Sequence, residues 1–187
     1  MSADVLRHLP NAICLLRMVL TVPTVLALQN GDHGLALVWF AVAAASDGID
    51  GFLAKRFGWT SELGRVLDPL ADKILLVAVF MTCVWHGLVP VWLATAAIAR
   101  DILITAGAIT FRLWFGEVNG RPTLISKANT ALQIVFLLGA IITPLVALDF
   151  ADELQALAIV TFVTTVLSGA DYTWRFLRVG WTRLEGA

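Results

Sequence analysis

Charged residues are scarce in this sequence. Of its 187 residues only 14% are charged, while 59% are hydrophobic, and the mean hydropathy is +0.84. Because a soluble domain carries about 25% charged residues, this composition excludes an ordinary soluble domain and predicts an integral membrane protein. The formal net charge of −1 provides no basic surface for nucleic acid, so we expect no nucleic-acid partner.

Cysteine is nearly absent as well. The two cysteines, Cys14 and Cys83, lie in apolar runs without a Cys-x-x-Cys pair, which argues against a disulfide framework or a thiolate metal site. The apolar runs do not alternate with polar residues as the strands of a membrane barrel do, so spanning helices remain. At ~20–25 residues per span, the sequence predicts an all-α protein with about six transmembrane helices in one membrane-embedded domain, residues 1–187.

Breaks in the apolar runs place these helices. Asn30-Gly31 and His86-Gly87 are helix-stop signals, and Pro90 suits the first turn of a helix. We expect helices at about residues 11–28, 35–57, 64–85, 90–115, 124–148 and 154–176, and residues 2–9 are a candidate for a short interfacial helix.

Lys and Arg are missing from alternate turns. The turns near Gly31, Gly87 and Asp149 contain neither, whereas basic residues surround the turns near Trp59 and Gly116 and follow the last helix. Under the positive-inside rule, this multi-pass protein has both termini and the basic turns in the cytoplasm. The missing basic, serine-rich presequence favours a bacterial inner (cell) membrane over a mitochondrial one.

Four carboxylates interrupt the second and third apolar helices. A charge at the centre of a spanning helix costs roughly 2.5–3.5 kcal/mol on insertion scales, so such residues need a counter-charge. Asp47 and Asp50 are separated by three positions, and Asp68 and Asp72 by four, which puts each pair on one helix face. If the two helices form an antiparallel hairpin, the four side chains make one acidic site near the cytoplasmic side.

Too few basic residues are available to neutralise these acids. With Asp101 there are five intramembrane acids, but the other Lys and Arg residues lie close to the turns and helix ends, which leaves Lys73 and Arg100 as the two intramembrane bases. Ligands that are all oxygen favour Mg²⁺, Mn²⁺ or Ca²⁺ over zinc. Two such ions ~3.5–4 Å apart can hold the attacking and leaving oxygens of a phosphoryl transfer. The acids therefore predict a divalent metal site, with two ions, that acts on a lipid pyrophosphate.

Other interpretations of the acids stay open. They can be structural partners of the two basic residues, or they can line the path of an ion or proton transporter. The chain is short for a transporter, and the carboxylate motif has no internal repeat. A polyprenyl transferase also uses Asp-x-x-Asp pairs, but its two acidic motifs are well separated in a longer chain.

The acidic segment resembles the signature of a known family, the CDP-alcohol phosphotransferases, which are six-helix membrane enzymes. The matching positions are Asp47, Asp50, Gly51, Ala54, Gly64, Asp68 and Asp72. Lys55 stands where the family usually has Arg, which keeps the charge but not the bidentate fork. The resemblance implies a bundle like that of the family and the transfer of a phosphatidyl group from CDP-diacylglycerol to an alcohol, with release of CMP.

The resemblance also implies roles for individual residues. Asp47, Asp50, Asp68 and Asp72 would hold the metal ions, and Asp72 would be the general base on the acceptor hydroxyl. Residues that would bind the CDP-lipid are Asn11, Arg17, Asp50, Gly51, Ala54, Lys55 and Gly64.

The acceptor is indicated by three further blocks of sequence. Residues 67–73, 99–101 and 121–133 look most like the eukaryotic-type cardiolipin synthases, which implies phosphatidylglycerol as the acceptor and cardiolipin as the product. The alternative is a phosphatidylglycerophosphate synthase, which uses glycerol 3-phosphate. Candidates for the phosphate of the acceptor are Arg100, Arg121 and Lys127. Relatives of this fold are commonly dimers, so a homodimer is expected.

Overall fold

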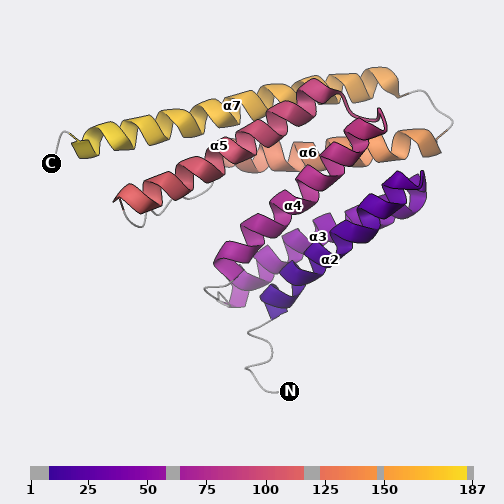
Figure 1. The fold of residues 1–187 in the computed structure, drawn as a ribbon, viewed down its shortest axis with the longest axis horizontal. Helices are drawn as coiled ribbons and strands as arrows, with labels where there is room; N and C mark the ends of the chain where they lie inside the picture. The colour runs from indigo at the N-terminus through magenta and orange to yellow at the C-terminus, as the bar shows by residue number, and fades with distance from the viewer. Residues whose placement is uncertain (1–8, 58–63, 116–122, 147–149, 185–187) are drawn as a thin grey trace. The chain divides into compact units, whose positions relative to one another are not determined.

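The computed structural model describes residues 9–57, 64–115, 123–146 and 150–184, with side chains described over 12–46, 71–110, 123–146 and 150–178. In these ranges it has six α-helices and one short 3-10 helix (Figure 1). They are α2 (Leu9–Gln29), α3 (His33–Phe57), α4 (Gly64–Trp85), α5 (Val91–Phe115), α6 (Leu124–Ile142), η1 (Thr143–Leu145) and α7 (Ala151–Leu184). The interfacial helix expected at residues 2–9 lies, apart from Leu9, outside the described residues.

Four of the helices are long and apolar enough to cross a membrane. The candidate spans are Ala12–Gln29, Val91–Thr110, Leu124–Leu145 and Ala151–Arg178, and α3 contributes a shorter apolar helix, His33–Ser46. The helical elements expected from the sequence are confirmed over the described residues, and the candidate spans found there are consistent with a membrane protein. The number of six spans stays a prediction.

Helices α6 and α7 differ most from the sequence-based bounds. Helix α6 ends at Ile142, earlier than the predicted residue 148, and continues only as the 3-10 turn that contains Pro144. Proline has no N–H to donate and its ring clashes with the preceding turn, which favours the end of the helix here, although α2 continues through Pro23. Helix α7 has 34 residues, or about 51 Å, which is longer than the ~30 Å hydrocarbon core.

Helices α2 and α4 end in the same glycine motif. The N–H of Asp32 donates to the carbonyl of Ala27 at 2.9 Å, and the N–H of Gly31 donates to that of Leu28 at 3.1 Å. Gly31 has φ +75° and Gly87, at the equivalent place after α4, has φ +71°. This Schellman motif satisfies carbonyls at the helix end and needs a left-handed residue, which explains why glycine stands at both positions.

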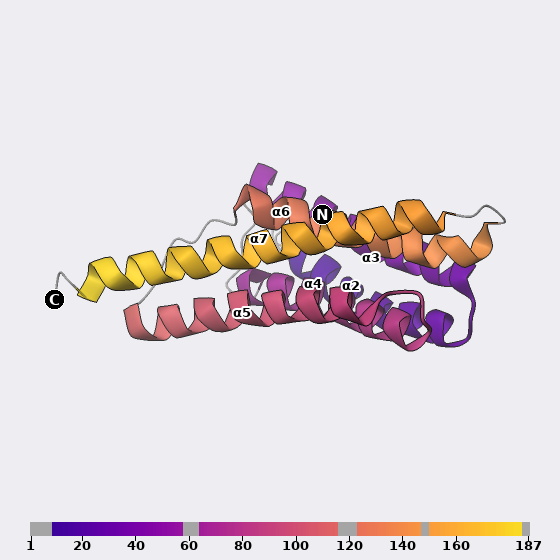
Figure 2. The same cartoon turned by 90° about the horizontal axis from the view of Figure 1, so that it is seen from above.

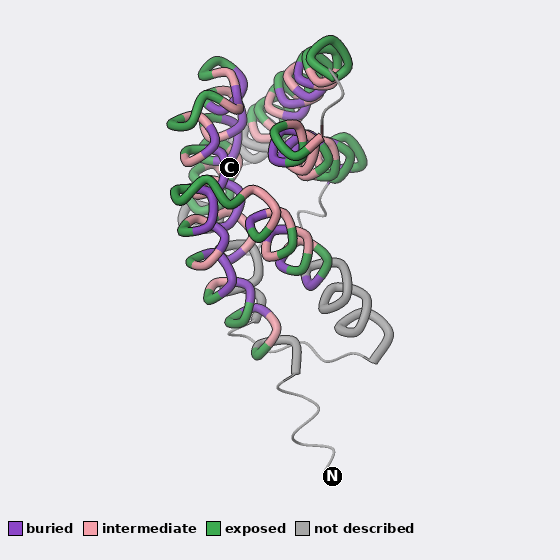
Figure 3. The backbone as a smooth tube through the Cα atoms, turned by 90° about the vertical axis from the view of Figure 1, so that its right-hand side faces the viewer, coloured by how far each residue is buried: buried purple, intermediate pink, exposed green. Residues whose placement is uncertain are grey.

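The chain divides into two compact units. The first comprises residues 1–89 and 137–150, and the second comprises residues 90–136 and 151–187. Because α6 contributes to both units, the expectation of one domain over residues 1–187 stays a prediction. In the first unit α2 packs against both α3 and α4, and buried residues recur along one side of the helices (Figure 3).

In the second unit α5 and α7 run side by side, as Figures 1 and 2 both show. A Cβ atom added to Gly107 would lie 2.7 Å from the ring of Phe176, and one added to Gly169 would lie 3.8 Å from Cγ of Arg100. Each helix therefore offers a glycine to a large side chain of the other. Three contacts set a parallel register: Trp92 with Phe162, Arg100 with Gly169, and Gly107 with Phe176.

Candidate functional site

The predicted metal ligands lie on two helices of the first unit. Asp47 and Asp50 fall within α3, and Asp68 and Asp72 fall within α4. Both helices are continuous there, so each pair shares one face of its helix, as its spacing requires. The side chain of Asp72 is partly buried, and those of the other three acids lie outside the described side chains. Whether all four converge therefore stays a prediction.

The chemistry of the predicted ligands suits a divalent cation. Among the residues that the structure describes, no three His, Cys or acidic side chains are grouped closely enough to hold a metal. Of the four predicted ligands, only Asp72 has a described side chain. Carboxylate oxygens are the donors that Mg²⁺ and Mn²⁺ prefer, so the residue types fit the ion and the complete ligand set is still a prediction.

One predicted ligand of the CDP-lipid is enclosed in the first unit. Arg17 has 0% of its surface exposed and lies within the apolar span 12–29 of α2. A cation at such a depth is costly and usually marks a functional site. The side chains of Asn11, Gly51, Ala54, Lys55 and Gly64 lie outside the described side chains, although Gly64 can be placed as the first residue of α4.

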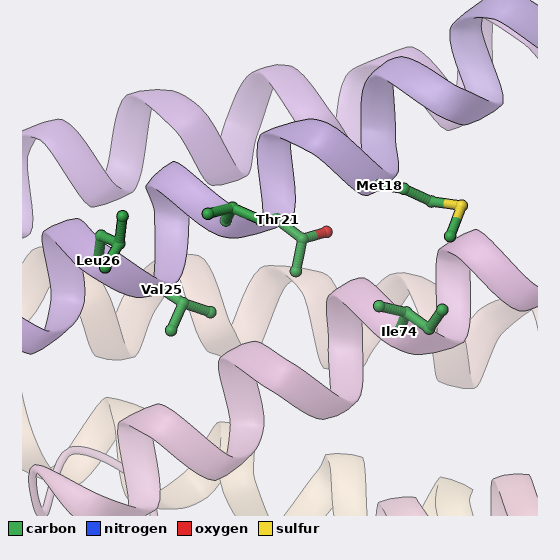
Figure 4. Close-up of a pocket in the computed structure, with 6 residues that line it drawn as sticks. Met18, Thr21, Val25, Leu26 and Ile74 are labelled. Carbon is green, nitrogen blue, oxygen red and sulfur yellow. The ribbon is translucent and has the colours of Figure 1, made fainter.

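An apolar groove of about 290 Å³ lies between α2 and α4. In Figure 4, Ile74 of α4 faces Met18 and Thr21 of α2. The hydroxyl of Thr21 donates to the carbonyl of Arg17 at 3.0 Å, so it is not directed at a ligand. The groove therefore offers hydrocarbon contact and no reactive group.

Of the predicted acceptor-phosphate residues Lys127 and Arg121, the structure describes only Lys127. Lys127 has an exposed side chain near the beginning of α6, and Arg121 lies outside the described residues. The helix begins at a threonine cap: Thr123 accepts the N–H of Ser126 on its hydroxyl and that of Lys127 on its carbonyl, both at 3.1 Å. This cap satisfies two N–H groups at the helix start and gives Lys127 a defined backbone.

Arg100, the third predicted acceptor-phosphate residue, is buried in the second unit and is 8% exposed. Its Nε and Nη2 donate to Oγ of Ser168 at 3.1 and 2.7 Å, and Nη2 also donates to Oγ of Ser126. Its Nη1 forms a salt bridge with Oδ1 of Asp101 at 2.7 Å. One guanidinium thus joins α5, α6 and α7, whereas sequence reasoning identified neither serine.

A second polar contact ties α6 to α7. Oδ1 of Asn129 accepts the hydroxyls of Thr164 and Thr165 at 3.0 and 2.8 Å. Nδ2 of Asn129 and Nε2 of Gln133 are buried with no hydrogen-bond partner among the described residues. Ser126, Asn129 and Gln133 are spaced by three and four positions, so they share one face of α6. That polar spacing in an apolar helix is the signal that could have identified these residues.

The buried residues of the two units differ in character. Among the described side chains, only four of the 21 buried residues in the first unit are polar, whereas eight of the 13 in the second unit are polar. The eight are Arg100, Asp101, Thr123, Asn129, Gln133, Thr161, Thr165 and Ser168.

Comparison with known proteins identifies one family. The family model for CDP-alcohol phosphatidyltransferase matches residues 7–181. A human protein named cardiolipin synthase (CMP-forming) is 31% identical over 88% of this chain. The chain spans 60% of the length of that protein and of its rat counterpart.

Bacterial relatives match over nearly their whole length. A Bacillus subtilis protein named CDP-diacylglycerol–glycerol-3-phosphate 3-phosphatidyltransferase is 30% identical over 95% of this chain and 97% of its own length. The protein of the same name from Escherichia coli K12 is 33% identical over 88% of this chain and 92% of its own length. The relatives thus include two different acceptor specificities.

Proposed function

Because the chain belongs to the CDP-alcohol phosphatidyltransferase family, we propose that it transfers the phosphatidyl group of CDP-diacylglycerol to phosphatidylglycerol. The products are cardiolipin and CMP. The single observation that carries this proposal is the family match over residues 7–181, which includes every predicted metal and substrate residue. The four candidate spans suit an enzyme whose donor and acceptor are both membrane lipids.

The proposed reaction is a displacement at phosphorus. The oxygen of an acceptor hydroxyl forms a bond to the phosphorus that carries diacylglycerol, and the bond from that phosphorus to the CMP oxygen breaks. Asp72 accepts the hydroxyl proton, since a positioned carboxylate is a suitable general base. Asp47, Asp50, Asp68 and Asp72 would hold two divalent ions, Mg²⁺ or Mn²⁺, whose charge would stabilise the attacking and leaving oxygens.

We assign the donor to residues of the first unit. Arg17, buried in α2, would contact the nucleotide phosphates together with Lys55, and Asn11, Gly51, Ala54 and Gly64 would shape the binding site. Arg121 and Lys127 would bind the phosphate of the acceptor. The exposed side chain of Lys127 is consistent with that role.

Glycerol 3-phosphate is the second candidate acceptor. It is favoured by the Bacillus subtilis relative, which this chain matches over 97% of that relative's length. Phosphatidylglycerol is favoured by the human relative and by the resemblance of residues 121–133. We also propose a homodimer in a bacterial inner membrane with the active site and both termini in the cytoplasm.

A single assay distinguishes the two acceptors. The full-length protein in lipid nanodiscs receives labelled CDP-diacylglycerol with either phosphatidylglycerol or glycerol 3-phosphate, and the lipid product is identified. We expect cardiolipin and CMP, with loss of both products after chelation and recovery with Mg²⁺ or Mn²⁺. Formation of phosphatidylglycerophosphate alone would reassign the acceptor, and ion flux without any CMP release would favour a transporter.

A further inference from the structure

We propose that Arg100 is a positioning residue: it fixes the first turns of α6, and with them Lys127, and does not itself bind the acceptor phosphate. This inference rests on the proposed function, because Lys127 is the acceptor-phosphate residue that Arg100 would position. The observation behind it is the buried hydrogen-bond cluster that joins Arg100 to Ser126 and Ser168.

The donors of Arg100 are already almost fully used. A guanidinium has five N–H groups. The structure gives Arg100 four hydrogen bonds, two to Ser168, one to Ser126 and one to Asp101, so one N–H stays unused among the described residues. A bidentate contact with phosphate needs two parallel N–H groups. Arg100 would have to release a serine or Asp101 before it could make one.

The site lies deep in the membrane span. Arg100 is the tenth residue of α5, about 14 Å from the helix start at 1.5 Å per residue, within the candidate span 91–110. An arginine there is tolerated when it is paired inside the bundle. In such surroundings of low dielectric constant, hydrogen bonds to a charged group are stronger than in water. The cluster can therefore hold three helices in one arrangement.

The hydrogen bond from Arg100 to Ser126 holds the backbone next to Lys127. Ser126 directly precedes Lys127 and belongs to the first turn of α6, whose N–H groups are capped by Thr123. The bond from Arg100 therefore fixes this turn to α5, and the two bonds to Ser168 fix Arg100 to α7. Three residues further along, Asn129 makes a separate tie to α7.

Two serine substitutions test the hydrogen-bond cluster without removing the positive charge of Arg100. Ser126→Ala removes the bond between Arg100 and α6, and Ser168→Ala removes the anchor on α7. Ser168 is 0% exposed and accepts two hydrogen bonds from Arg100, so its substitution does not remove a direct contact with the acceptor. For either variant we expect the KM for the acceptor to rise about tenfold, the effect of one lost hydrogen bond to a charged group. The KM for CDP-diacylglycerol should change less than about twofold.

A double-mutant cycle separates positioning from direct binding. If Arg100 acts through Lys127, Ser168→Ala in a Lys127→Ala background should add less than about twofold to the acceptor KM, because the group being positioned is gone. Fully multiplicative effects would overturn the proposal. Ser126→Thr keeps the hydroxyl and should keep the acceptor KM. The matched control is Thr95→Ala, since the exposed Thr95 hydroxyl on α5 donates only to the carbonyl of Val91, at 2.8 Å.

Hydrogen exchange provides a readout that does not depend on turnover. In Ser168→Ala we expect faster amide exchange over residues 124–130, because the first turns of α6 are held through Arg100. Exchange should be unchanged over residues 91–97, which precede the cluster on α5. Unchanged exchange at 124–130 would overturn the proposal even if the enzyme uses another acceptor. Absence of CMP release by the unsubstituted protein would instead contradict the proposed function.

Discussion

The two units of this chain bury different kinds of side chain. Of the side chains that the structure describes, those buried in the first unit are mainly apolar, whereas eight of the 13 buried in the second unit are polar. Lipid offers little hydrophobic driving force for helix association, so close packing and hydrogen bonds must hold the helices together. The helices of the first unit are held together mainly by packing, and those of the second unit mainly by hydrogen bonds between buried polar groups. Substitutions should therefore affect the two units in different ways.

The largest effect is expected from Asp72→Asn in the first unit. The amide has the size of the carboxylate but cannot take up the acceptor proton, so the rate of CMP release should fall ~10²–10⁴-fold. Binding of CDP-diacylglycerol should remain, which a thermal shift with this lipid measures. Near-normal turnover would remove Asp72 from the base role.

The matched control for this variant is Asp32→Asn. Asp32 is an exposed acid of the same unit, and its carboxylate accepts the N–H of Leu35 at 3.1 Å at the beginning of α3. Asparagine caps helices about as well as aspartate, so both CMP release and thermal stability should stay unchanged. A large loss here would show that the assay responds to any change of charge.

Phe40→Ala should destabilise the first unit through packing alone. Phe40 is 0% exposed on α3. In water such a substitution costs ~3–5 kcal/mol, but lipid removes much of the transfer contribution. We therefore expect a loss of about 2 kcal/mol from the free energy of unfolding, with the acceptor KM unchanged. Thermal and denaturant unfolding in detergent, beside steady-state kinetics, measure both quantities.

A smaller effect is expected where glycine lets α5 and α7 approach. A Cβ at residue 107 would meet the Phe176 ring at 2.7 Å, so Gly107→Ala should cost ~1–2 kcal/mol by overpacking. The same substitution at Gly34, in α3, meets only Oδ1 of Asp32 at 3.8 Å and should be neutral or stabilising, because alanine is the better helix former. Equal unfolding temperatures for the two variants would contradict the close approach of α5 and α7.

The smallest effect is expected from Gln133→Leu in the second unit. It removes a buried amide with no partner for Nε2 among the described residues, so the free energy of unfolding should stay constant or rise by up to about 1 kcal/mol. Leu137→Gln makes the reverse change one turn later, at a residue that is 0% exposed in the first unit, and should cost ~1–3 kcal/mol. A destabilised Gln133→Leu variant would mean that this amide has a partner.

Local signals were sufficient to predict much of the fold. The helix-stop signal at Gly31 and Gly87 was correct because only a left-handed residue suits that motif, and α3 and α4 end at Phe57 and Trp85 as expected. Hydropathy could not predict that α7 begins before its apolar stretch and ends after it. Polar residues also extend a helix as long as the backbone hydrogen bonds are satisfied. The predicted end of α6 followed the apolar run and did not take Pro144 into account, so it was placed too late.

The candidate site was predictable only in part. The helical spacing of Asp68 and Asp72 could be read directly from the sequence, because residues four positions apart share a helix face. The role of Arg100 could not be read in this way. It was a candidate for the acceptor phosphate, but the structure gives it Asp101, Ser126 and Ser168 as partners.

Composition and spacing were sufficient to predict a membrane-embedded helical protein with paired acids, because hydropathy and helix periodicity are properties of neighbouring residues. The tertiary structure decided which polar groups meet. Ser126 and Ser168 are 26 and 68 positions from Arg100, and only the packing of α5, α6 and α7 brings these three side chains within hydrogen-bond distance. Separations of that size leave no periodic signal in the sequence, since the geometry depends on how whole helices pack.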